Sequence, residues 1–590
     1  MEEKFLLPEG ASCGFRALTK GKDGNLYIGS NDGCLYSFDI DSTSFKKASE
    51  LLPHKTCCTG AYTSVSGKIY VGIYPDGNFF QYDPLTGSTK RFSTLPKGNL
   101  GLYCTGFIDL PDGKMLIMTT GGNPGIVLFD PESGKTEIVY EGNTEKETRG
   151  FFNGFMDSDR IIANYHESIR IFNWKKMAFE KDLIEDFHES LFLLEKAGDE
   201  YYFGGCPSGN MYKISNAKLE VVKKDFPAFN MVNNYHALGD NEFICIGDNG
   251  LVMRFNLKTG SFRSHQIDNI ADKGMAIQFL SKIPGEDFIV GAHFINSQMF
   301  RIKLSEKKSE SSLTKVVHAP GQVNCGTVLN GKFYSGSYIG ALVSEYDWNK
   351  TFVPRENPLI IAKIGDKQNR PIDMVNDGKF IYIATGAEYG TLGGAISVLE
   401  PLSRQMETYR DFVKGQNPTC LYRSGNGFLV GGTDIFGDCG TAKPTAPHAV
   451  LFQWDTKQRK TVHSMTPWEI PHLKITSMSP SDICIGTKNP PGQDGEEYFL
   501  WDTKTGNCEI KKWPLRGVFI GGVFMNDREF YGATEHGLFV LDIKTNDYEM
   551  LSSSTKKTGS YCTRCFRKLN ENEFIFDIEG VNVMKAIIKK

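Results

Sequence analysis

The sequence repeats one pattern along almost its whole length, and this repeat constrains the fold more than any other feature. Each unit has a turn followed by an alternating apolar strand that ends in Gly or Ala, as in Asp23–Gly29 and Asp377–Ala384. A second alternating strand follows and usually ends in an acidic or amide residue. These closing positions are Asp39, Asp83, Asp130, Asn173, Ser215, Asn256, Lys303, Asp347, Glu400, Asp455, Asp502 and Asp542.

The spacing of the closing positions indicates the kind of repeat. From Asp39 to Asp542 the chain runs 503 residues in 11 steps, about 46 residues per step, and single steps range from 40 to 55. A four-stranded propeller blade takes roughly 40–50 residues. Asp-Gly and Asn-Gly pairs suit the positive φ angles of tight hairpin turns, so each pair marks a strand–turn–strand junction. The pattern therefore predicts an all-β protein of four-stranded blades.

The number of repeats predicts two rings. A thirteenth, shorter unit occupies 559–590, whereas a single propeller typically has about 4–8 blades. We expect tandem propellers at 1–317, with about seven blades, and 318–590, with six to seven. The boundary is placed after the charged, Ser-rich stretch Ser305–Ser312. An N-terminal strand near Lys4–Leu7 could complete the last blade, and insertion of one ring within the other is the main alternative.

Composition narrows the setting in which the protein works. The 590 residues carry a formal net charge of −4, so there is no basic field to neutralise a row of phosphates, and nucleic acid is not an expected partner. The sequence shows no signal peptide and no stretch of 18 apolar residues, so no membrane association is expected. Most of the 14 cysteines lie in strand-like runs, which is typical of buried free thiols. These features predict a cytoplasmic protein.

The units resemble the divergent blades of the WD40-like, quinoprotein-like and streptogramin-lyase-like superfamilies. Trp454-Asp455 and Trp501-Asp502 look like the WD dipeptide, although the Gly-His pair of a WD40 blade is absent. Among propellers of this kind, the streptogramin and oligogalacturonate lyases use histidines, polar side chains and a divalent metal around the central channel. They remove a proton next to a carbonyl and expel an oxygen leaving group. The resemblance implies a propeller fold, but a fold by itself implies no activity.

In a propeller, the loop entering the innermost strand and the loop between the second and third strands rise on one face, where functional residues gather. Histidine there can act as a metal ligand or a proton acceptor, and a nearby cation can hold a carboxylate. In the first ring we predict a site with a divalent metal (Mn, Mg or Ca) held by histidines. The candidate catalytic residues are Arg149, His166, Tyr235, His236 and His293, with the three histidines as metal ligands, and the candidate substrate-binding residues are Asn153, Asn233, Lys273 and Gln278.

The second ring offers two glycine-rich loops, 386–394 and 432–440, in the two units with the longest steps. Glycine lets backbone approach a ligand closely, and an aromatic ring can stack on a sugar. Carboxylates in these loops could act as acid or base, as in glycoside hydrolysis. The candidate substrate-binding residues are Tyr338, Arg370, Glu388, Tyr389 and Asp434.

Two functions are compatible with these features. One is a carbohydrate-active enzyme, a lyase or hydrolase acting on oligosaccharides that contain uronic acid; its partner is a small-molecule or oligosaccharide substrate. The other is a non-catalytic double propeller that binds a protein partner or a sugar, because repeat folds offer wide, rigid surfaces.

Overall fold

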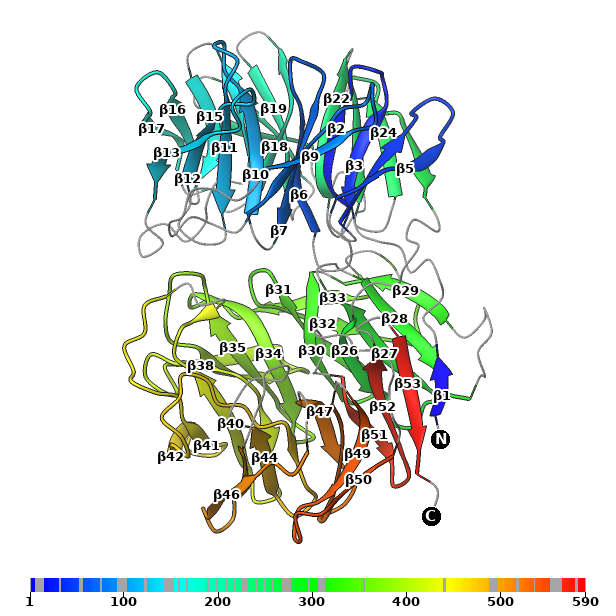
Figure 1. The fold of residues 1–590 in the computed structure, drawn as a ribbon, viewed down its shortest axis with the longest axis vertical. Helices are drawn as coiled ribbons and strands as arrows, with labels where there is room; N and C mark the ends of the chain where they lie inside the picture. Colours follow the sequence, from blue (N-terminus) through cyan, green and yellow to red (C-terminus); the bar gives the residue numbers. More distant parts are fainter. Residues whose placement is uncertain are drawn as a thin grey trace. The chain divides into compact units, whose positions relative to one another are not determined.

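The computed structural model is all-β, which confirms the predicted fold class. It describes residues 2–5, 15–30, 33–51, 57–74, 77–92, 103–120, 125–142, 153–157, 160–165, 168–185, 187, 190–197, 200–206, 210–215, 218–223, 232–239, 241–247, 251–256, 258–267, 277–294, 298–305, 313–319, 321–351, 353, 356–438, 442–487, 497–515, 519–534, 536–551, 565–578 and 582–588. These residues form thirteen antiparallel sheets and no α-helix (Figure 1). No helix in this part of the chain is long and apolar enough to cross a membrane.

The chain divides into two compact units. The N-terminal unit is residues 10–273, and the C-terminal unit is residues 274–590 together with residues 1–9. The N-terminal unit is thus inserted within the other, an arrangement that the sequence left open. The boundary lies between residues 273 and 274, whereas the sequence placed it between 317 and 318.

The N-terminal unit contains six of the described sheets, each with strands in chain order. Their bounds are β2–β5 (Phe15–Lys20, Leu26–Ser30, Cys34–Phe38, Phe45–Glu50), β6–β9 (Cys57–Thr63, Ile69–Tyr74, Phe79–Tyr82, Thr89–Phe92), β10–β13 (Tyr103–Asp109, Met115–Thr120, Gly125–Phe129, Thr136–Glu141), β14–β17 (Asn153–Asp157, Arg160–Tyr165, Ser168–Asn173, Ala178–Ile184), β18–β21 (Ser190–Ala197, Glu200–Cys206, Met211–Ser215, Lys218–Lys223) and β22–β25 (Val232–Gly239, Glu242–Gly247, Leu251–Asn256, Phe262–Gln266).

The C-terminal unit contains the other seven described sheets. Their bounds are β26–β29 (Ile277–Lys282, Phe288–His293, Gln298–Lys303, Leu313–His318), β30–β33 (Gln322–Leu329, Lys332–Tyr338, Leu342–Tyr346, Leu359–Lys363), β34–β37 (Gln368–Asn376, Ile381–Ala387, Ala395–Glu400, Gln405–Arg410), β38–β42 (Asn417–Pro418, Tyr422–Arg423, Phe428–Asp434, Leu451–Asp455, Lys460–Met465), β43–β46 (Ser477–Met478, Ile483–Thr487, Glu497–Asp502, Cys508–Lys512), β47–β50 (Phe519–Phe524, Glu529–Thr534, Gly537–Asp542, Tyr548–Met550) and β51–β53 with β1 (Arg567–Asn570, Glu573–Ile578, Asn582–Ile587; Glu2–Phe5).

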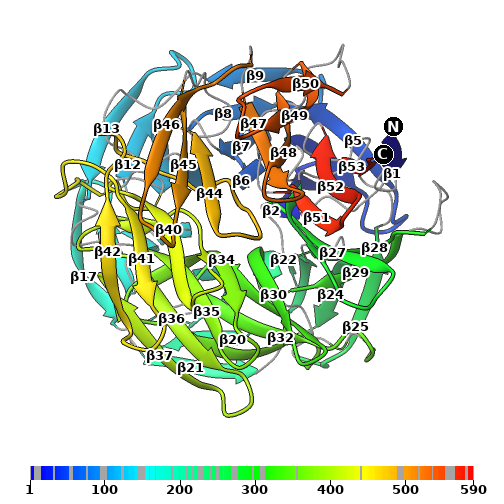
Figure 2. The same cartoon turned by 90° about the horizontal axis from the view of Figure 1, so that it is seen from below.

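The last sheet joins the two ends of the chain. Strand β1 pairs antiparallel with β53, so that the sheet order is β1-β53-β52-β51. The chain therefore supplies the fourth strand of this sheet from its N-terminus, which covers an edge of β53 that would otherwise be open. In Figure 2 the sheets of the C-terminal unit are arranged around a common centre, with β30, β34 and β51 nearer to it than β37 and β42.

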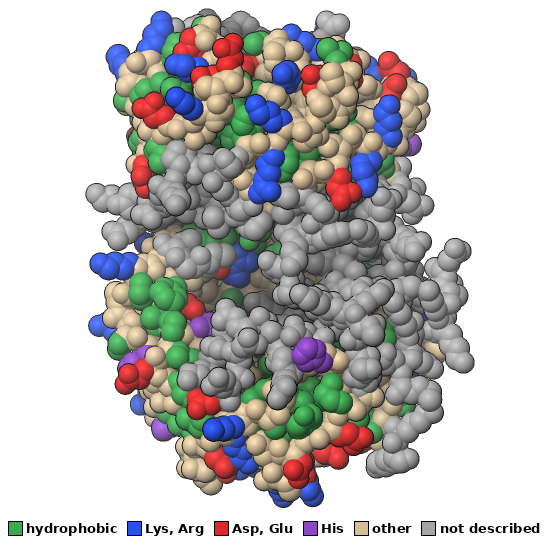
Figure 3. Space-filling model, viewed as in Figure 1, with side chains coloured by type: hydrophobic (Ala, Val, Ile, Leu, Met, Phe, Trp, Pro, Cys, Tyr) green, Lys and Arg blue, Asp and Glu red, His purple; other side chains and the backbone are tan. Residues whose placement is uncertain are grey.

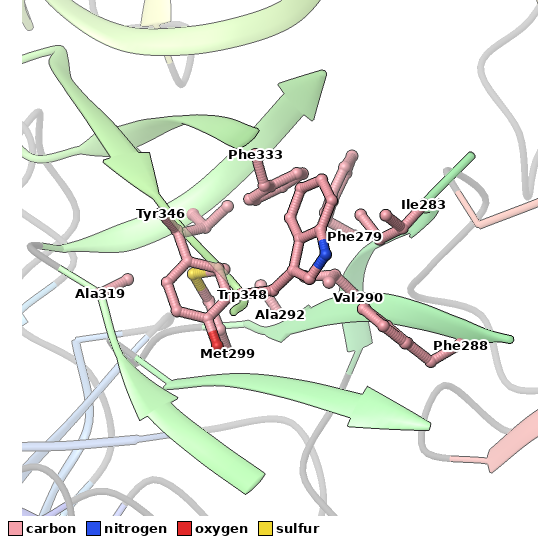
Figure 4. Close-up of a cluster of buried hydrophobic side chains, with 11 residues drawn as sticks. Phe279, Ile283, Phe288, Val290, Ala292, Met299, Ala319, Phe333, Tyr346 and Trp348 are labelled. Atoms are coloured by element: carbon pink, nitrogen blue, oxygen red, sulfur yellow. The ribbon is translucent and has the colours of Figure 1, made fainter. Parts of the chain in front are cut away.

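Buried side chains between neighbouring sheets form the cores, and they explain why the unit boundary precedes β26. Sheet β26–β29 packs on one side against the last sheet, where Leu280 and Phe300 meet Ile575. On its other side it packs against β30–β33, where Trp348 and Phe288 belong to one buried cluster with ring centres 6.4 Å apart (Figure 4). Since both neighbours belong to the C-terminal unit, this sheet belongs there too. The stretch Ser305–Ser312 falls between β28 and β29 of one sheet instead of between domains.

The closing residues of the repeat have a local structural role. The Oδ1 atom of Asp39 accepts hydrogen bonds from the amides of Asp41 and Ser42, each at 2.9 Å. Asp455 makes the same contact with two amides in the turn that follows it. These amide donors, led by the Ser42 amide for Asp39, hold the pKa of each carboxyl below its usual range. The repeated Asp or Asn therefore stabilises the turn between the third and fourth strands.

Candidate functional site

In several sheets of the C-terminal unit, the start of the first strand lies beside the end of the second strand. The register pairs Gln322 with Tyr338, Gln368 with Ala387, and Asn417 with Asp434. The segments that precede the first strands and follow the second strands therefore emerge at one end of each sheet. We call this end the loop edge, and the sequence predicts functional residues on it.

Four side chains from three neighbouring sheets meet at the loop edge, and we call them the Arg370 cluster: Tyr338, Arg370, Tyr389 and Asp438. Arg370 Nε donates to both Asp438 carboxylate oxygens at 2.9 Å. The Arg370 guanidinium carbon lies 3.8 Å from the centre of the Tyr338 ring. Arg370 Nη2 donates to the Tyr389 hydroxyl at 3.1 Å, and this hydroxyl lies 2.8 Å from that of Tyr338. The sequence predicted three of the four residues, and the structure brings these three together.

The ionic pair in this cluster is largely shielded from water. The Asp438 side chain is 8% exposed and the Arg370 side chain is 17% exposed. Two such charges lose hydration when the chain folds, and only close pairing with well-placed hydrogen bonds offsets this cost. The Tyr338 ring adds a cation–π contact on one face of the guanidinium. The cluster is therefore a rigid arrangement in which each group restricts the next.

Amide side chains at the starts of the first strands fix the backbone on which Arg370 stands. Gln368 Nε2 donates to the Gly393 carbonyl at 3.2 Å, and its Oε1 accepts a hydrogen bond from Thr385 at 2.9 Å. The next sheet repeats this contact, because Thr433 donates to Gln416 Oε1. Both glutamines are buried. A recurring Gln–Thr pair thus fastens the loop edge of two neighbouring sheets.

Glycines in the two long loops are required by close packing. A Cβ atom on Gly432 would lie 2.2 Å from the Leu473 carbonyl oxygen, and one on Gly394 would lie 2.5 Å from the Thr385 oxygen. Real Cβ atoms do not come this close to backbone, so a larger residue would displace a neighbouring strand. A Cβ on Gly394 would also lie 2.5 Å from Pro418 of the next sheet, so both glycines allow segments of adjacent sheets to pack closely at the loop edge.

A second group on the same edge pairs the predicted residue Asp434 with His472, which the sequence did not single out. His472 Nδ1 lies 3.1 Å from Asp434 Oδ2, and both side chains are partly exposed, at 29% and 22%. Glu388, a predicted residue, is half-buried, and its carboxylate has no hydrogen bond or ion pair with any residue in the described part of the chain. Phe436, between Asp434 and Asp438, is 38% exposed. His472 lies in the segment that leads into the first strand β43, and that position was the available signal.

Further along the first strands, charged groups from different sheets interact. Asp373 of β34 is half-buried, and desolvation raises the pKa of its carboxyl. The amides of Leu421 and Met374 and the positive charges of Arg567 and Lys474 act in the opposite direction. Arg567 is on β51 of the last sheet and Asp373 is on β34 of the third, so charges on the first strands of different sheets act on this carboxyl.

The residues predicted for the first ring fall in both units. His293 is fully buried at the end of β27 in the C-terminal unit, whereas His236 is on β22 in the N-terminal unit. His236 is half-buried, and desolvation lowers the pKa of its ring to about 4. Gln278 is buried on β26. Arg149, His166 and Lys273 lie outside the described residues, and for Asn153, Asn233 and Tyr235 the structure describes the backbone only.

The predicted metal site stays a prediction, because His166, one of its three predicted ligands, lies outside the described residues. Among those residues, His, Cys, Asp and Glu side chains do not gather in groups of three or more. Metal sites in proteins generally need three or four such donors at short distances. Since the donors present do not form such a set, we derive no catalytic step through a metal.

Comparisons with known proteins give weak structural similarities. No protein-family model and no curated protein sequence matches the chain. Among solved structures, it is similar to the extracellular domain of the putative hybrid two-component system BT4673 from B. thetaiotaomicron (10% identity, 99% of this chain and 82% of that chain, TM-score 0.38). It is also similar to PorZ, a surface component of the type-IX secretion system of Porphyromonas gingivalis (10% identity, 99% of this chain and 86% of that chain, TM-score 0.38). A third similar structure is the tricorn protease (13% identity, 97% of this chain and 60% of that chain, TM-score 0.35). Similarities this weak carry no argument about function.

Proposed function

We propose that the C-terminal unit binds an oligosaccharide containing uronic acid at its loop edge and cleaves it as a lyase. The observation that carries this proposal is the Arg370 cluster. A guanidinium, two phenol hydroxyls and a carboxylate from three sheets converge at an edge where the backbone pairing alone requires none of them. Arginine is suited to a carboxylate and phenols are suited to sugar hydroxyls, while exposed Phe436 offers a ring on which a sugar can stack.

The chemistry is a β-elimination that balances without a co-reactant. A base removes the proton from the carbon next to the uronate carboxylate, and the electron pair of that C–H bond forms a carbon–carbon double bond. The neighbouring C–O bond breaks, and its oxygen takes a proton from an acid. The Arg370 guanidinium stabilises negative charge that grows on the carboxylate, and a hydroxyl of Tyr338 or Tyr389 supplies the proton. The step involves neither oxidation nor reduction of the protein.

We also propose that each unit is a closed propeller, with six blades in the N-terminal unit and seven in the C-terminal unit. In the C-terminal unit the first and last sheets share a core, and Lys282 Nζ donates to the Leu569 carbonyl at 3.2 Å. In the N-terminal unit β2 lies against β22, and Arg254 Nη1 is 3.9 Å from Asp41 Oδ1. Contact between first and last sheets is what ring closure requires.

The test is a panel of oligogalacturonates and other uronate oligosaccharides with the full chain, read by the ultraviolet absorbance of the unsaturated product. Arg370→Met and Tyr389→Phe should each lower turnover about 100-fold, which is typical when one group that stabilises a transition state is removed. Tyr409→Phe is the matched control, because that hydroxyl contacts Glu407 on the outer strand β37.

Other outcomes would favour other functions. Binding of the oligosaccharides without any product would make the protein a sugar receptor. If the oligosaccharides neither bind nor react, and a pull-down retrieves a protein partner in stoichiometric amount, the scaffold function is supported instead. A parallel reaction with a chelator, followed by Mn²⁺, Mg²⁺ or Ca²⁺, tests the metal that the sequence predicted. In Figure 3 positive and negative side chains are interspersed over the visible face, so substrate charge would be recognised by local groups.

A further inference from the structure

We propose that His472 is the general base of this elimination and that Asp434 positions it; the inference rests on the lyase function proposed above. His472 Nδ1 lies 3.1 Å from Asp434 Oδ2. A carboxylate accepts hydrogen bonds and cannot donate them, so this contact places the imidazole proton on Nδ1. The lone pair is then on Nε2, the atom that can remove a proton from carbon.

The backbone holds the two side chains in place. Asp434 and His472 face each other in an antiparallel bridge. On either side of it, the Ile435 amide donates to the Pro471 carbonyl at 3.1 Å, and the Leu473 amide donates to the Thr433 carbonyl at 2.9 Å. A base must be positioned within a fraction of an ångström, and a side-chain pair on a hydrogen-bonded bridge meets that need better than one on an unpaired loop.

The second oxygen of Asp434 is also occupied. Its Oδ1 accepts a hydrogen bond from the Phe436 amide at 2.7 Å. This contact fixes the rotation of the carboxylate, so that Oδ2 points at the imidazole. Such support for a histidine by an oriented carboxylate selects one tautomer and stabilises the imidazolium that forms when the ring takes a proton.

His472 is also more accessible than His293, the predicted histidine in the same unit. The His472 side chain is 29% exposed, and in the described part of the chain its Nε2 has no hydrogen-bond partner. His293 is fully buried. An accessible, oriented imidazole therefore occurs at the loop edge and is absent at position 293.

One short segment connects the base to the Arg370 cluster. Asp434 orients His472, Asp438 binds Arg370, and the exposed ring of Phe436 lies between them in sequence. A sugar ring stacked on Phe436 would therefore be close to both groups. In the elimination, the proton leaves carbon for His472 Nε2, and the acid at the cluster protonates the departing oxygen.

The test compares His472→Gln and Asp434→Asn with His463→Gln, a control at an exposed histidine on β42. Turnover of trigalacturonate and its Kd by calorimetry are measured with the full chain. We expect His472→Gln to lower kcat at least 100-fold with Kd within about threefold of the parent. Asp434→Asn should lower kcat about tenfold with Kd unchanged, and Asp434→Glu should restore part of the loss. His463→Gln should change nothing.

A second measurement does not need a variant that folds. Diethyl pyrocarbonate modifies accessible imidazoles, and peptide mapping of the parent protein identifies the modified ring. Trigalacturonate should protect His472 and leave His463 reactive. Turnover that persists in His472→Gln, or equal labelling of His472 with and without trigalacturonate, would overturn the role of His472 while leaving the lyase function intact. Absence of any turnover by the parent would overturn both.

Discussion

Removing one partner of the Arg370–Asp438 pair should cost far more stability than the pair itself contributes. Both side chains are largely shielded, at 17% and 8% exposed. Breaking a buried ion pair by deleting one member typically costs about 3–5 kcal/mol, because the remaining charge stays desolvated. Arg370→Met also loses the contact of the guanidinium with the Tyr338 ring, worth about 1 kcal/mol. We therefore expect Arg370→Met to lower the free energy of unfolding of the C-terminal unit by about 4–6 kcal/mol.

A double-mutant cycle separates this effect from general damage. Asp438→Asn alone leaves the guanidinium without its carboxylate, so in Arg370→Met/Asp438→Asn the two losses should overlap by at least about 2 kcal/mol. Urea unfolding followed by tryptophan fluorescence is suitable, because five of the six tryptophans are in the C-terminal unit. The control cycle uses Arg410 and Asp366, a more exposed pair at 3.7 Å whose coupling should stay below about 1 kcal/mol. The reasoning would be refuted if the losses of unfolding free energy in Arg370→Met and Asp438→Asn simply added up in the double variant.

Four further predictions concern the scaffold. Gly432→Ala should destabilise the C-terminal unit by about 1–3 kcal/mol in urea unfolding and lower turnover too, because its Cβ would press on the carbonyl oxygen of Leu473, next to His472; equal turnover would contradict this. Burial raises the pKa of Asp577 to about 7, so between about pH 4 and 7 the folded state keeps a proton that the unfolded chain loses. The free energy of unfolding should therefore fall by about 1.4 kcal/mol for each pH unit of increase in this range. Asp577→Asn should remove this slope when urea unfolding is measured at several pH values. The pKa of His236 is lowered to about 4, so the N-terminal unit should lose stability as pH falls from about 6.5 to 4, and His236→Gln should flatten that loss. Deleting residues 1–9 should lower the unfolding midpoint of the C-terminal unit, since β53 loses its partner, and should leave the N-terminal unit unchanged in hydrogen exchange.

Features produced by local interactions were readable from the sequence. The closing residues recur because each one caps its own turn, as Asp39 does for the amides of Asp41 and Ser42. The loop edge was readable as well, because antiparallel pairing places the start of one strand beside the end of the next. That rule put Tyr338, Arg370 and Tyr389 on the same edge before any contact between them was known.

Features produced by contacts between sheets were not readable. The carboxylate of Asp434 meets His472 across 38 residues, and Arg370 meets Asp438 across 68. No repeated pattern marks such pairs, since each depends on how one loop lies over the next sheet. The unit boundary was misplaced for a related reason. A charged, Ser-rich stretch shows only that a segment is solvated, and Ser305–Ser312 is a connection between two strands of the same sheet.

The repeat also explains why a site can arise here at little structural cost. In every sheet of the C-terminal unit, backbone pairing fixes the end of the second strand whatever side chain stands there. The residues at these strand ends differ widely: His293, Tyr338, Ala387, Asp434, Thr487, Thr534 and Ile578. Backbone pairing therefore does not dictate which residue stands at these strand ends. Two of them, Tyr338 and Asp434, contact partners from neighbouring sheets: Arg370, near the start of β34, and His472, in the segment that leads into β43. Contacts between sheets at these positions are thus how a regular scaffold assembles the irregular set of side chains at its loop edge.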